Sequence, residues 1–390
     1  MSLNGSSTPD TLLTGVKKIW SALDRTCAIL DTGKIKCWGD IYSYSVPGNP
    51  GNMPIPINLS VRKAQDLDWL NDNFQSMALG YSHGCVTTLA GGVKCWRDHD
   101  QIKELGELGD GLIKHTPLKL VNVKGLEAGV KSVVAGASFS CALTATGGVK
   151  CWGSNVLGQL GDGTFTNRTE PVDVSGLSSG VVGLYNGPGS TCASLESGEV
   201  KCWGLNDFGL LGNGANINKN TPVLVTSLKQ KIESMAVGAG HSCALTTAKK
   251  VYCWGRNNAG QLGNGYEGPK LDAQEVKDIP ENVISISTFN TETCALTDQG
   301  TVKCWGNDFR FPNDANKDTF HRAHAAVVKD LSGVKELSVG LRHNCAITTV
   351  GGVKCWGDFT RGQLGDGTYA NTNSNGPGIW RKGPVDVILK

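Results

Sequence analysis

The chain has 390 residues, 39% of them hydrophobic, and a formal net charge of +2 at pH 7. A charge this close to zero gives no long-range field that would steer nucleic acid or an anionic membrane surface, so we expect no nucleic-acid partner. No apolar run approaches the roughly 20 residues that span a bilayer, and 52 glycines favour short strands joined by turns over long helices.

Residues 1–13 precede the regular part of the chain. They begin MSLNGSSTPD, without the basic segment and apolar core of a secretory signal. We expect these residues to be disordered or derived from cloning, and a native signal peptide to be absent from this sequence. Residues 14–390 are expected to form a single domain.

Seven cysteine pairs organise that domain. The two cysteines of a pair lie ten positions apart, a Trp directly follows the second one, and no cysteine is left over. Successive first cysteines lie 58, 56, 51, 51, 51 and 51 residues apart, a period typical of solenoids and propellers. The pairs are Cys27/Cys37, Cys85/Cys95, Cys141/Cys151, Cys192/Cys202, Cys243/Cys253, Cys294/Cys304 and Cys345/Cys355.

Each repeat contains the same predicted elements in the same order. An alternating strand such as Val130–Ala135 is followed by a strand with the first cysteine and, after a tight turn, by the Cys-Trp strand. A polar loop then leads to a fourth strand, such as residues 171–174. Four short strands per repeat are the composition of a propeller blade, so the sequence predicts an all-β fold.

The turn between the two cysteines has a specific signature. If the cysteines face each other, a type I turn closed by a G1 bulge needs a positive φ six positions after the first cysteine. Lys249 occupies that position in the fifth repeat, where we expect a strained or differently shaped turn. The other repeats have glycine there, namely Gly33, Gly91, Gly147, Gly198, Gly300 and Gly351.

This register places the two cysteines of a hairpin in a non-hydrogen-bonded pair. Their Cα atoms should then lie about 4.5 Å apart, a separation that a disulfide accepts. We predict one intra-hairpin disulfide per repeat, each stabilising its unit by roughly 2–3 kcal/mol for a closed loop of about eleven residues. Buried free thiols are an alternative. Zinc needs about four convergent ligands, so we expect no metal.

The sequences around the cysteines resemble the regulator of chromosome condensation repeat family. In GAGHSCALTTAKKVYCWGRNNAGQLGNG, from Gly238 to Gly265, the resemblance lies in the Gly before the H-S-C strand, the A-L-T turn, the Cys-Trp-Gly strand end and the N-x-x-G-Q-L-G-D/N-G loop. It extends over nearly the whole chain and implies a seven-bladed β-propeller. The doubled cysteines are similar to those of exported bacterial members, and disulfides at this density imply a secreted, cell-surface or periplasmic protein.

The family resemblance also implies how the ring closes. Family members usually join strands from both chain ends in one blade. Here the final segment, residues 383–387, repeats the pattern of residues 171–174, whereas the chain begins near Thr14 with the strand that should follow. We therefore expect residues 14–390 to be closed by strands from both chain ends.

The loop after the Trp departs from the repeat in four places. Gln-Leu-Gly is clear only in repeats three, four (as Leu-Leu-Gly), five and seven, and irregular loops follow Trp38, Trp96, Trp305 and Trp356. These four repeats are consecutive around a closed ring, so we expect their loops on one sector of one face. Exposed aromatic side chains are frequent interface anchors. The candidate binding residues are Tyr42, Tyr44, Trp69, His99, Phe309, Phe311 and Trp380, of which Trp69 and Trp380 are either anchors or internal caps of a blade.

No residue pattern marks a catalytic site, so we expect no catalytic residues and no enzymatic activity. His83, His241 and His343 all stand two positions before a cysteine, which favours a hydrogen-bonding role at the start of a strand. The spacing of His321 and His324 is only a weak indication of a metal. Asp-Gly and Asn-Gly pairs in the loops are typical of turns rather than of calcium sites.

We interpret the chain as a non-enzymatic extracellular or periplasmic scaffold, expected to be monomeric and without cofactor, that binds a protein through irregular loops on one face. The family resemblance leaves two alternatives. One is guanine-nucleotide exchange or chromatin docking, as in eukaryotic members. The other is inhibition of a secreted enzyme such as a β-lactamase, as in some exported bacterial relatives.

Overall fold

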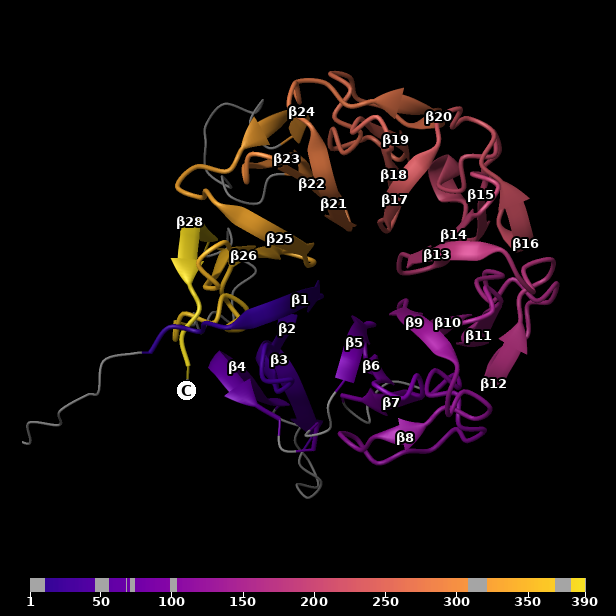
Figure 1. Cartoon of the computed structure of the whole chain (residues 1–390), viewed down its shortest axis with the longest axis horizontal. Coiled ribbons are helices and arrows are strands. Elements are labelled where there is room, and N and C mark those ends of the chain that lie inside the picture. The colour runs from indigo at the N-terminus through magenta and orange to yellow at the C-terminus, as the bar shows by residue number, and fades with distance from the viewer. Residues whose placement is uncertain are drawn as a thin grey trace, which may run out of the picture.

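The computed structural model describes residues 11–45, 56–67, 69–70, 74–98, 104–307, 321–368 and 380–389, with the backbone alone at 41–45, 56–61, 307, 321–322, 380 and 382. These residues form seven four-stranded antiparallel sheets around a central axis, called blades 1 to 7 in chain order (Figure 1). The predicted all-β, seven-bladed propeller is therefore confirmed. One 3-10 helix, η1 (Asp207–Gly209), lies in a loop. In the described part of the chain, no helix is long and apolar enough to cross a bilayer.

The first strand of each blade lies next to the axis, and the second strand lies farther from the axis (Figure 1). The second strands are buried almost throughout, because each lies between neighbouring sheets. The first strands are β1 (Val16–Ala22), β5 (Phe74–Leu79), β9 (Val130–Ala135), β13 (Val181–Asn186), β17 (Ile232–Val237), β21 (Val283–Phe289) and β25 (Val334–Val339). The second strands are β2 (Arg25–Leu30), β6 (His83–Thr88), β10 (Phe139–Thr144), β14 (Ser190–Leu195), β18 (His241–Thr246), β22 (Glu292–Thr297) and β26 (His343–Thr348).

The third strand carries the Cys-Trp pair, and the fourth forms the outer edge of the blade. The third strands are β3 (Ile35–Ser45), β7 (Val93–Arg97), β11 (Val149–Gly153), β15 (Val200–Gly204), β19 (Val251–Gly255), β23 (Val302–Asn307) and β27 (Val353–Asp358). The fourth strands are β4 (Pro56–Asp66), β8 (Val121–Asn122), β12 (Arg168–Asp173), β16 (Lys219–Leu224), β20 (Lys270–Glu275), β24 (His321–Val327) and β28 (Trp380–Asp386).

A disulfide joins the second and third strands of every blade. The Cα atoms of the seven bonded pairs are 4.0 or 4.1 Å apart, and no cysteine is free. The predicted intra-hairpin disulfides are therefore confirmed in all seven blades, and the alternative of buried free thiols is wrong. In blade order, the bonds join Cys27 to Cys37, Cys85 to Cys95, Cys141 to Cys151, Cys192 to Cys202, Cys243 to Cys253, Cys294 to Cys304 and Cys345 to Cys355.

The turn at Lys249 has the same shape as its glycine counterparts. Lys249 has a φ of 62°, close to the 70–88° of the six glycines at this position. Its two backbone bonds, Thr246 N to Lys250 O and Lys249 N to Thr246 O, are both 2.9 Å long, as are those from Leu30 N to Lys34 O and from Gly33 N to Leu30 O. Of the two expected outcomes, the strained turn is therefore confirmed and the differently shaped turn is wrong.

The core is built between blades rather than within them. The loop after the third strand of one blade lies on the Trp of the next blade, and we call this covering loop the lid. In blade 3 the lid residue Gly161 has a φ of 67°, and a Cβ added to it would lie 2.8 Å from Nε1 of Trp203. Four tryptophans donate an indole hydrogen bond of 2.9 Å to a lid carbonyl: Trp152 to Glu107, Trp203 to Gln159, Trp254 to Leu210 and Trp305 to Gln261.

Blade 2 also has a regular lid, although its loop does not contain Gln-Leu-Gly. Glu107, Leu108 and Gly109 take the places of Gln159, Leu160 and Gly161, and Leu108 is 1% exposed. The lid therefore extends beyond the repeats in which Gln-Leu-Gly is clear, because it contributes a carbonyl and a leucine side chain to the Trp. Either Gln or Glu supplies that carbonyl from its backbone.

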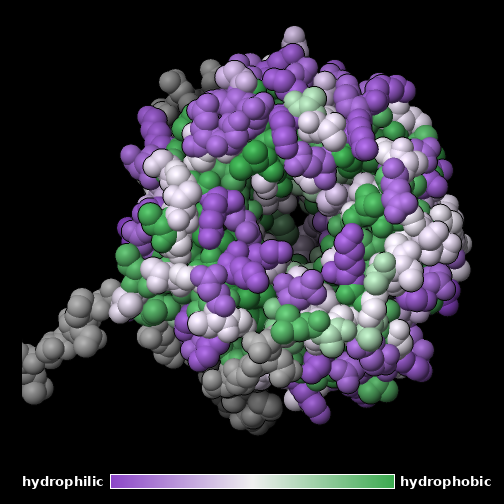
Figure 2. Space-filling view, viewed as in Figure 1, coloured by the Kyte–Doolittle hydropathy of each residue, from purple (hydrophilic) through white to green (hydrophobic). Residues whose placement is uncertain are grey.

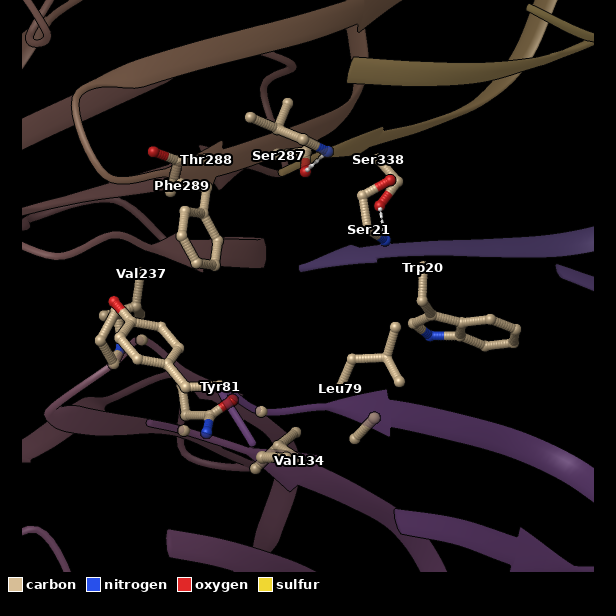
Figure 3. A pocket seen from close by; sticks show the side chains of 18 of the residues that line it. Trp20, Ser21, Leu79, Tyr81, Val134, Val237, Ser287, Thr288, Phe289 and Ser338 are labelled. Carbon is tan, nitrogen blue, oxygen red and sulfur yellow. Dashed lines mark hydrogen bonds between the residues drawn. The ribbon is translucent and has the colours of Figure 1, made fainter. Parts of the chain in front are cut away.

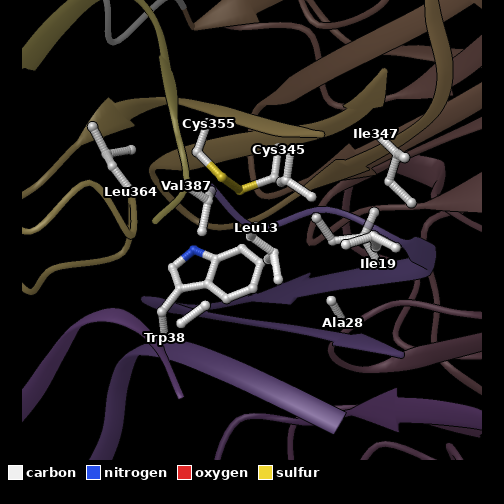
Figure 4. Packing of buried hydrophobic residues seen from close by; sticks show 12 residues of the cluster. Leu13, Ile19, Ala28, Trp38, Cys345, Ile347, Cys355, Leu364 and Val387 are labelled. Carbon is white, nitrogen blue, oxygen red and sulfur yellow. A yellow bond between two sulfur atoms is a disulfide. The ribbon is translucent and has the colours of Figure 1, made fainter. Parts of the chain in front are cut away.

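The ring closes between blades 7 and 1. Trp38 of blade 1 packs with Leu364 and Val387 from the end of the chain and with Leu13 from its beginning (Figure 4). Backbone bonds run from Leu13 N to Val387 O, 2.9 Å, and from Ala64 N to Ile388 O, 2.8 Å. Apolar burial and backbone hydrogen bonds therefore hold the two ends together.

The two chain ends meet beside the blades and not within a shared sheet. Each four-stranded sheet consists of consecutive strands, with β1–β4 in one and β25–β28 in another. Two isolated bridges make the connection, an antiparallel one between Leu12 and Ile388 and a parallel one between Ala64 of β4 and Leu389. This arrangement differs from the blade with strands from both ends that the family resemblance implies, because β28 already completes blade 7.

Replacing Lys249 by Gly should stabilise the protein, because glycine adopts a positive φ without the clash of a Cβ atom. We expect a gain of about 0.5–1 kcal/mol in the free energy of unfolding, measured by denaturant titration with the disulfides intact. Lys249→Ala is the matched control, since it keeps the strain and loses only the exposed ion pair with Glu233. A Gly variant no more stable than the Ala variant would contradict the prediction.

Candidate functional site

Two sets of loops share one face of the ring, which we call the loop face. The turn from the first to the second strand and the connection from the third to the fourth strand emerge at the same end, because successive strands are antiparallel. Backbone bonds join the two sets in blades 1 to 5 and 7, as from Asp98 N to Ser82 O, 3.0 Å, and from Ser154 N to Ser138 O, 2.8 Å. A surface formed on this face therefore combines loops from both sets.

The strands that hold the irregular loops lie on one side of the ring. They are the pairs β3/β4, β7/β8, β23/β24 and β27/β28, and Figure 1 shows them in consecutive blades around the closure. All four connections leave the end of a third strand, so they start from the loop face. The strand ends from which the predicted binding loops start therefore lie on one sector of that face.

The structure describes only some of the predicted binding residues. Tyr42 and Tyr44 lie on the extended part of β3, and Trp380 begins β28 opposite Asp358 of β27. His99, Phe309 and Phe311 lie outside the described residues. Trp69 is described in full and has a clear structural role.

Trp69 packs against the core of blade 2. Its ring meets that of Trp96 edge to face, with centroids 5.5 Å apart and an interplanar angle of 61°. Leu67 and Leu70 are buried in the same cluster. Trp69 therefore lies where blade 1 covers the Trp of the next blade, which corresponds to an internal cap and leaves one edge of the ring partly exposed.

A network of charged side chains holds the loop after the third strand of blade 2. Arg25 of blade 1 pairs with Asp98, which also accepts a 3.0 Å hydrogen bond from the indole of Trp96. Arg25 and Asp98 side chains are each 6% exposed. This buried pair joins blades 1 and 2 at the start of an irregular loop, and losing one partner would leave a buried charge unpaired.

The second part of the network centres on Glu104. Its carboxylate lies 2.5 Å from Nη1 of Arg97 and 2.5 Å from Nδ1 of His115, whose Nε2 lies 2.9 Å from Asp110. Burial alone favours neutral groups, yet hydrogen bonds from His115 and Arg97 hold the pKa of Glu104 below its usual value. Burial likewise opposes charge on His115, but hydrogen bonds to Glu104 and Asp110 raise its pKa. The loop is therefore held by His115 between two carboxylates, which favour its protonated form.

A pocket of about 270 Å³ opens at the centre of the loop face. The carboxyl ends of all seven first strands contribute to it, because these strands surround the axis. Figure 3 shows Tyr81 and Phe289 together at one side of the pocket, with Leu79 and Trp20 at the other. The ring centroids of Tyr81 and Phe289 are 6.1 Å apart. Figure 2 shows the opening at the centre of the ring, with hydrophilic and hydrophobic residues around it.

The three histidines of the repeat join neighbouring blades. Each uses Nε2 to contact a hydroxyl on the next blade: His83 with Ser140 at 2.8 Å, His241 with Thr293 at 2.7 Å and His343 with Thr26 at 2.7 Å. All three are fully buried. The predicted hydrogen-bonding role is confirmed, and the contact of His343 crosses the closure of the ring.

The described residues contain one cluster spaced for a metal, formed by Glu292, Cys294 and Cys304. The two sulfur atoms are bonded to each other, so they are not free to act as thiolate ligands. Glu292 instead accepts a 3.0 Å hydrogen bond from Asn344 of the next blade. His324 is exposed and pairs with Asp278.

Stability should fall in acid because of the buried histidines. Burial lowers the pKa of His83 and His343 to about 3 and that of His241 to about 4. Unfolded histidine titrates near pH 6.5, so the contribution is complete above that pH and is lost as the pH falls towards 3. Each histidine that is buried as a neutral group should lower the free energy of unfolding by about 1.4 kcal/mol per pH unit below about pH 6.

His343→Phe tests this linkage, since Phe139 occupies the same position in blade 3. The variant should lose the contact with Thr26 and be less stable at pH 7.5. Its stability should nevertheless fall less steeply between pH 6 and 4.5 than that of the wild type, as measured by unfolding with the disulfides intact. His324→Ala, which removes an exposed histidine, is the control. Equal slopes for the wild type and His343→Phe would disprove the assignment.

Trp69→Ala should destabilise the chain, because it uncovers Trp96. We expect a loss of about 1–3 kcal/mol, below the cost for a fully buried Trp because the ring is partly exposed. Trp69→Phe keeps an aromatic ring on Trp96 and should recover most of the stability. If thermal unfolding shows both variants to be as stable as the wild type, Trp69 is not a cap.

Two models of the regulator of chromosome condensation (RCC1) repeat match the chain. One matches residues 197–245 and 250–296, and the other matches residues 130–159, 232–261 and 334–363. The matches fall on blades 3 to 7, and they include repeats from both the regular and the irregular side of the ring.

Relatives and solved structures agree with these matches. The ultraviolet-B receptor UVR8 of Arabidopsis thaliana is 34% identical over 241 residues, which cover 60% of this chain and 54% of the receptor. The human E3 ubiquitin-protein ligase HERC2 is 30% identical over 273 residues, 67% of this chain but 6% of the ligase. The chain thus spans about half the length of the first relative and a small part of the second.

The fold is also that of Prp20p from Saccharomyces cerevisiae. The TM-score is 0.73 at 19% identity, over 96% of this chain and 87% of the yeast protein, whose structure was described with its binding properties to Gsp1p and histones. Seven blades of this fold, the repeats matched along the chain and the shared sequence with UVR8 show that the chain belongs to the RCC1-repeat family.

Proposed function

We propose that the protein is a secreted, cell-surface or periplasmic scaffold that binds another protein through the loop face. It acts as a monomer, without a cofactor and without catalysing a reaction. One observation supports the proposal: in a ring with a disulfide in every blade, the strands that flank the irregular connections belong to four consecutive blades.

The disulfides support an oxidising compartment. Cytosolic and nuclear thiols are kept reduced, and stable disulfides are rare there. All fourteen cysteines of this chain are bonded, and each bond lies in the buried core of its blade. An exported protein retains such bonds without any further protection.

The rigid ring supports protein binding. Loops held on a stiff scaffold lose little conformational entropy on association, so more of the contact energy appears as affinity. The binding of Gsp1p and histones by Prp20p shows that a ring of this fold serves protein partners in yeast. Inhibition of a secreted enzyme would be one specific form of the function proposed here.

The compartment is tested by the thiol content of the native protein. Protein isolated from its source without reductant should take up no alkylating reagent after denaturation, and reduction should then expose fourteen thiols. Intact mass spectrometry measures both. Fourteen free thiols before reduction would overturn the proposal and favour a nuclear or cytosolic role such as nucleotide exchange.

The binding face is tested on a partner captured from the secreted fraction by cross-linking. Tyr44→Ala and Trp380→Ala, on the strands that flank the irregular connections of blades 1 and 7, should each weaken binding at least tenfold, or about 1.4 kcal/mol. Tyr266→Ala is the control, because Tyr266 is 70% exposed on the regular loop of blade 5. Unaltered affinity of both loop variants, or an equal loss with the control, would contradict the assignment of the face.

A further inference from the structure

The central pocket of the loop face has a role that the irregular loops do not supply. We propose that it receives one neutral aromatic side chain of the bound protein, so that the partner is anchored at the axis of the ring. The inference rests on the proposed function, and it names the chemistry that the partner presents at that site.

The walls of the pocket are apolar and aromatic. Trp20, Leu79, Tyr81, Val134 and Phe289 are half-buried residues from four first strands and the turn after β5 (Figure 3). The rings of Tyr81 and Phe289 are tilted by 36° with centroids 6.1 Å apart, so they offer both faces and edges to an entering ring. Aromatic pairs of this geometry are favourable beyond the area that they bury.

Three serine and threonine hydroxyl groups in the pocket already take part in hydrogen bonds between or at the ends of strands. Ser338 Oγ accepts a 2.7 Å hydrogen bond from Ser21 N, and Ser287 Oγ accepts one of 3.1 Å from Val339 N. Thr288 Oγ1 lies 2.8 Å from Nε2 of His241 and donates to the carbonyl of Glu292. These groups therefore offer little polar attraction to a ligand.

Asn186 differs from those hydroxyl-bearing residues. It lines the pocket at the end of β13, and its amide nitrogen is buried with no hydrogen-bond partner in the described structure. A buried donor without a partner is uncommon in folded proteins. A ligand that brings one acceptor, such as a backbone carbonyl or a phenol oxygen, would satisfy it once the Asn186 amide turns towards the pocket.

Charge narrows the class of ligand. None of the described residues that line the pocket is charged at neutral pH, and burial raises the pKa of the Tyr81 hydroxyl, which keeps this residue neutral. A phosphate, a nucleotide or a carboxylate would lose its water here without gaining a counter-charge. A neutral ring with one acceptor meets no such penalty.

Size and position favour a side chain over a free small molecule. The volume of about 270 Å³ lies below the roughly 300–1,000 Å³ of pockets that enclose whole ligands. The pocket also lies at the centre of the loop face, and binding energy concentrates in central pockets that are filled by aromatic anchors and shielded by surrounding contacts. The irregular loops around it would provide that shielding.

The test uses blocked amino acids as probes. Saturation-transfer NMR on the full chain should detect N-acetyl-tyrosine amide and N-acetyl-tryptophan amide at millimolar concentration. N-acetyl-glutamate amide and N-acetyl-lysine amide should bind at least tenfold more weakly. Equal signals from charged and aromatic probes, or no signal from the aromatic ones at about 10 mM, would overturn the proposal.

Variants locate the binding. Tyr81→Leu keeps an apolar residue in the turn, and Asn186→Leu keeps the size of the side chain but removes the donor. Each variant should weaken the binding of the aromatic probes at least fivefold. Phe165→Ala, which removes an exposed ring from the regular blade 3, should have no effect on that binding. Probe binding that survives both pocket variants would place the probes elsewhere and overturn the proposal.

The two proposals fail separately. If the captured partner loses affinity with Trp380→Ala but not with Tyr81→Leu or Asn186→Leu, the pocket proposal is wrong and the loop face stands. If the probes bind in the pocket and the captured partner binds both loop variants as tightly as the wild type, the proposed function is wrong. In that case the pocket takes free neutral aromatic molecules and not a side chain of a bound protein.

Discussion

The fold depends on the lid that each blade places over the Trp of the next. A four-stranded sheet cannot bury a Trp at the end of its third strand, so the preceding blade must cover it. In the regular blades a leucine packs there, a glycine lies against the indole ring, and a carbonyl accepts the indole hydrogen bond, as Gln159 does for Trp203. Each blade covers the Trp of the blade that follows it, so these contacts run in one direction around the ring. The array is complete only when the last blade covers Trp38 of the first.

Two stabilising interactions therefore act on different scales. The disulfides hold each hairpin within its own blade, where they limit local opening. The lids and the histidine contacts hold blades to one another, and His343 with Thr26 does so at the closure. Reduction would loosen hairpins first, whereas acid would act on the junctions, because it charges histidines that are buried as neutral groups. A protein stabilised in both ways keeps a fixed loop face in an oxidising medium near neutral pH.

The features that follow from local spacing could be predicted from the sequence. The interval between cysteines sets the register of the hairpin, so both the bond between Cys243 and Cys253 and the positive φ at Lys249 between them follow from spacing alone. The sequence motif missed the lid of blade 2, because its contact uses a backbone carbonyl that Glu107 supplies as well as Gln. The central pocket was also missed. Tyr81 and Phe289 come from blades 2 and 6, and no local pattern shows that closing the ring brings them together.

The lids also explain why loop length varies on this face without damage to the ring. In blade 1 the cap, Trp69 with its neighbouring leucines, follows β4, so it is separate from the long connection between β3 and β4. In blade 2 the lid at residues 107–109 follows the extra residues, and in blade 7 the lid at residues 363–365 precedes them. Chain can therefore be added before or after a lid, provided that the lid still reaches the next Trp. A surface built in this way can change its partner by changing loops alone, while the aromatic pocket at the axis, made from the ends of the first strands, keeps its shape.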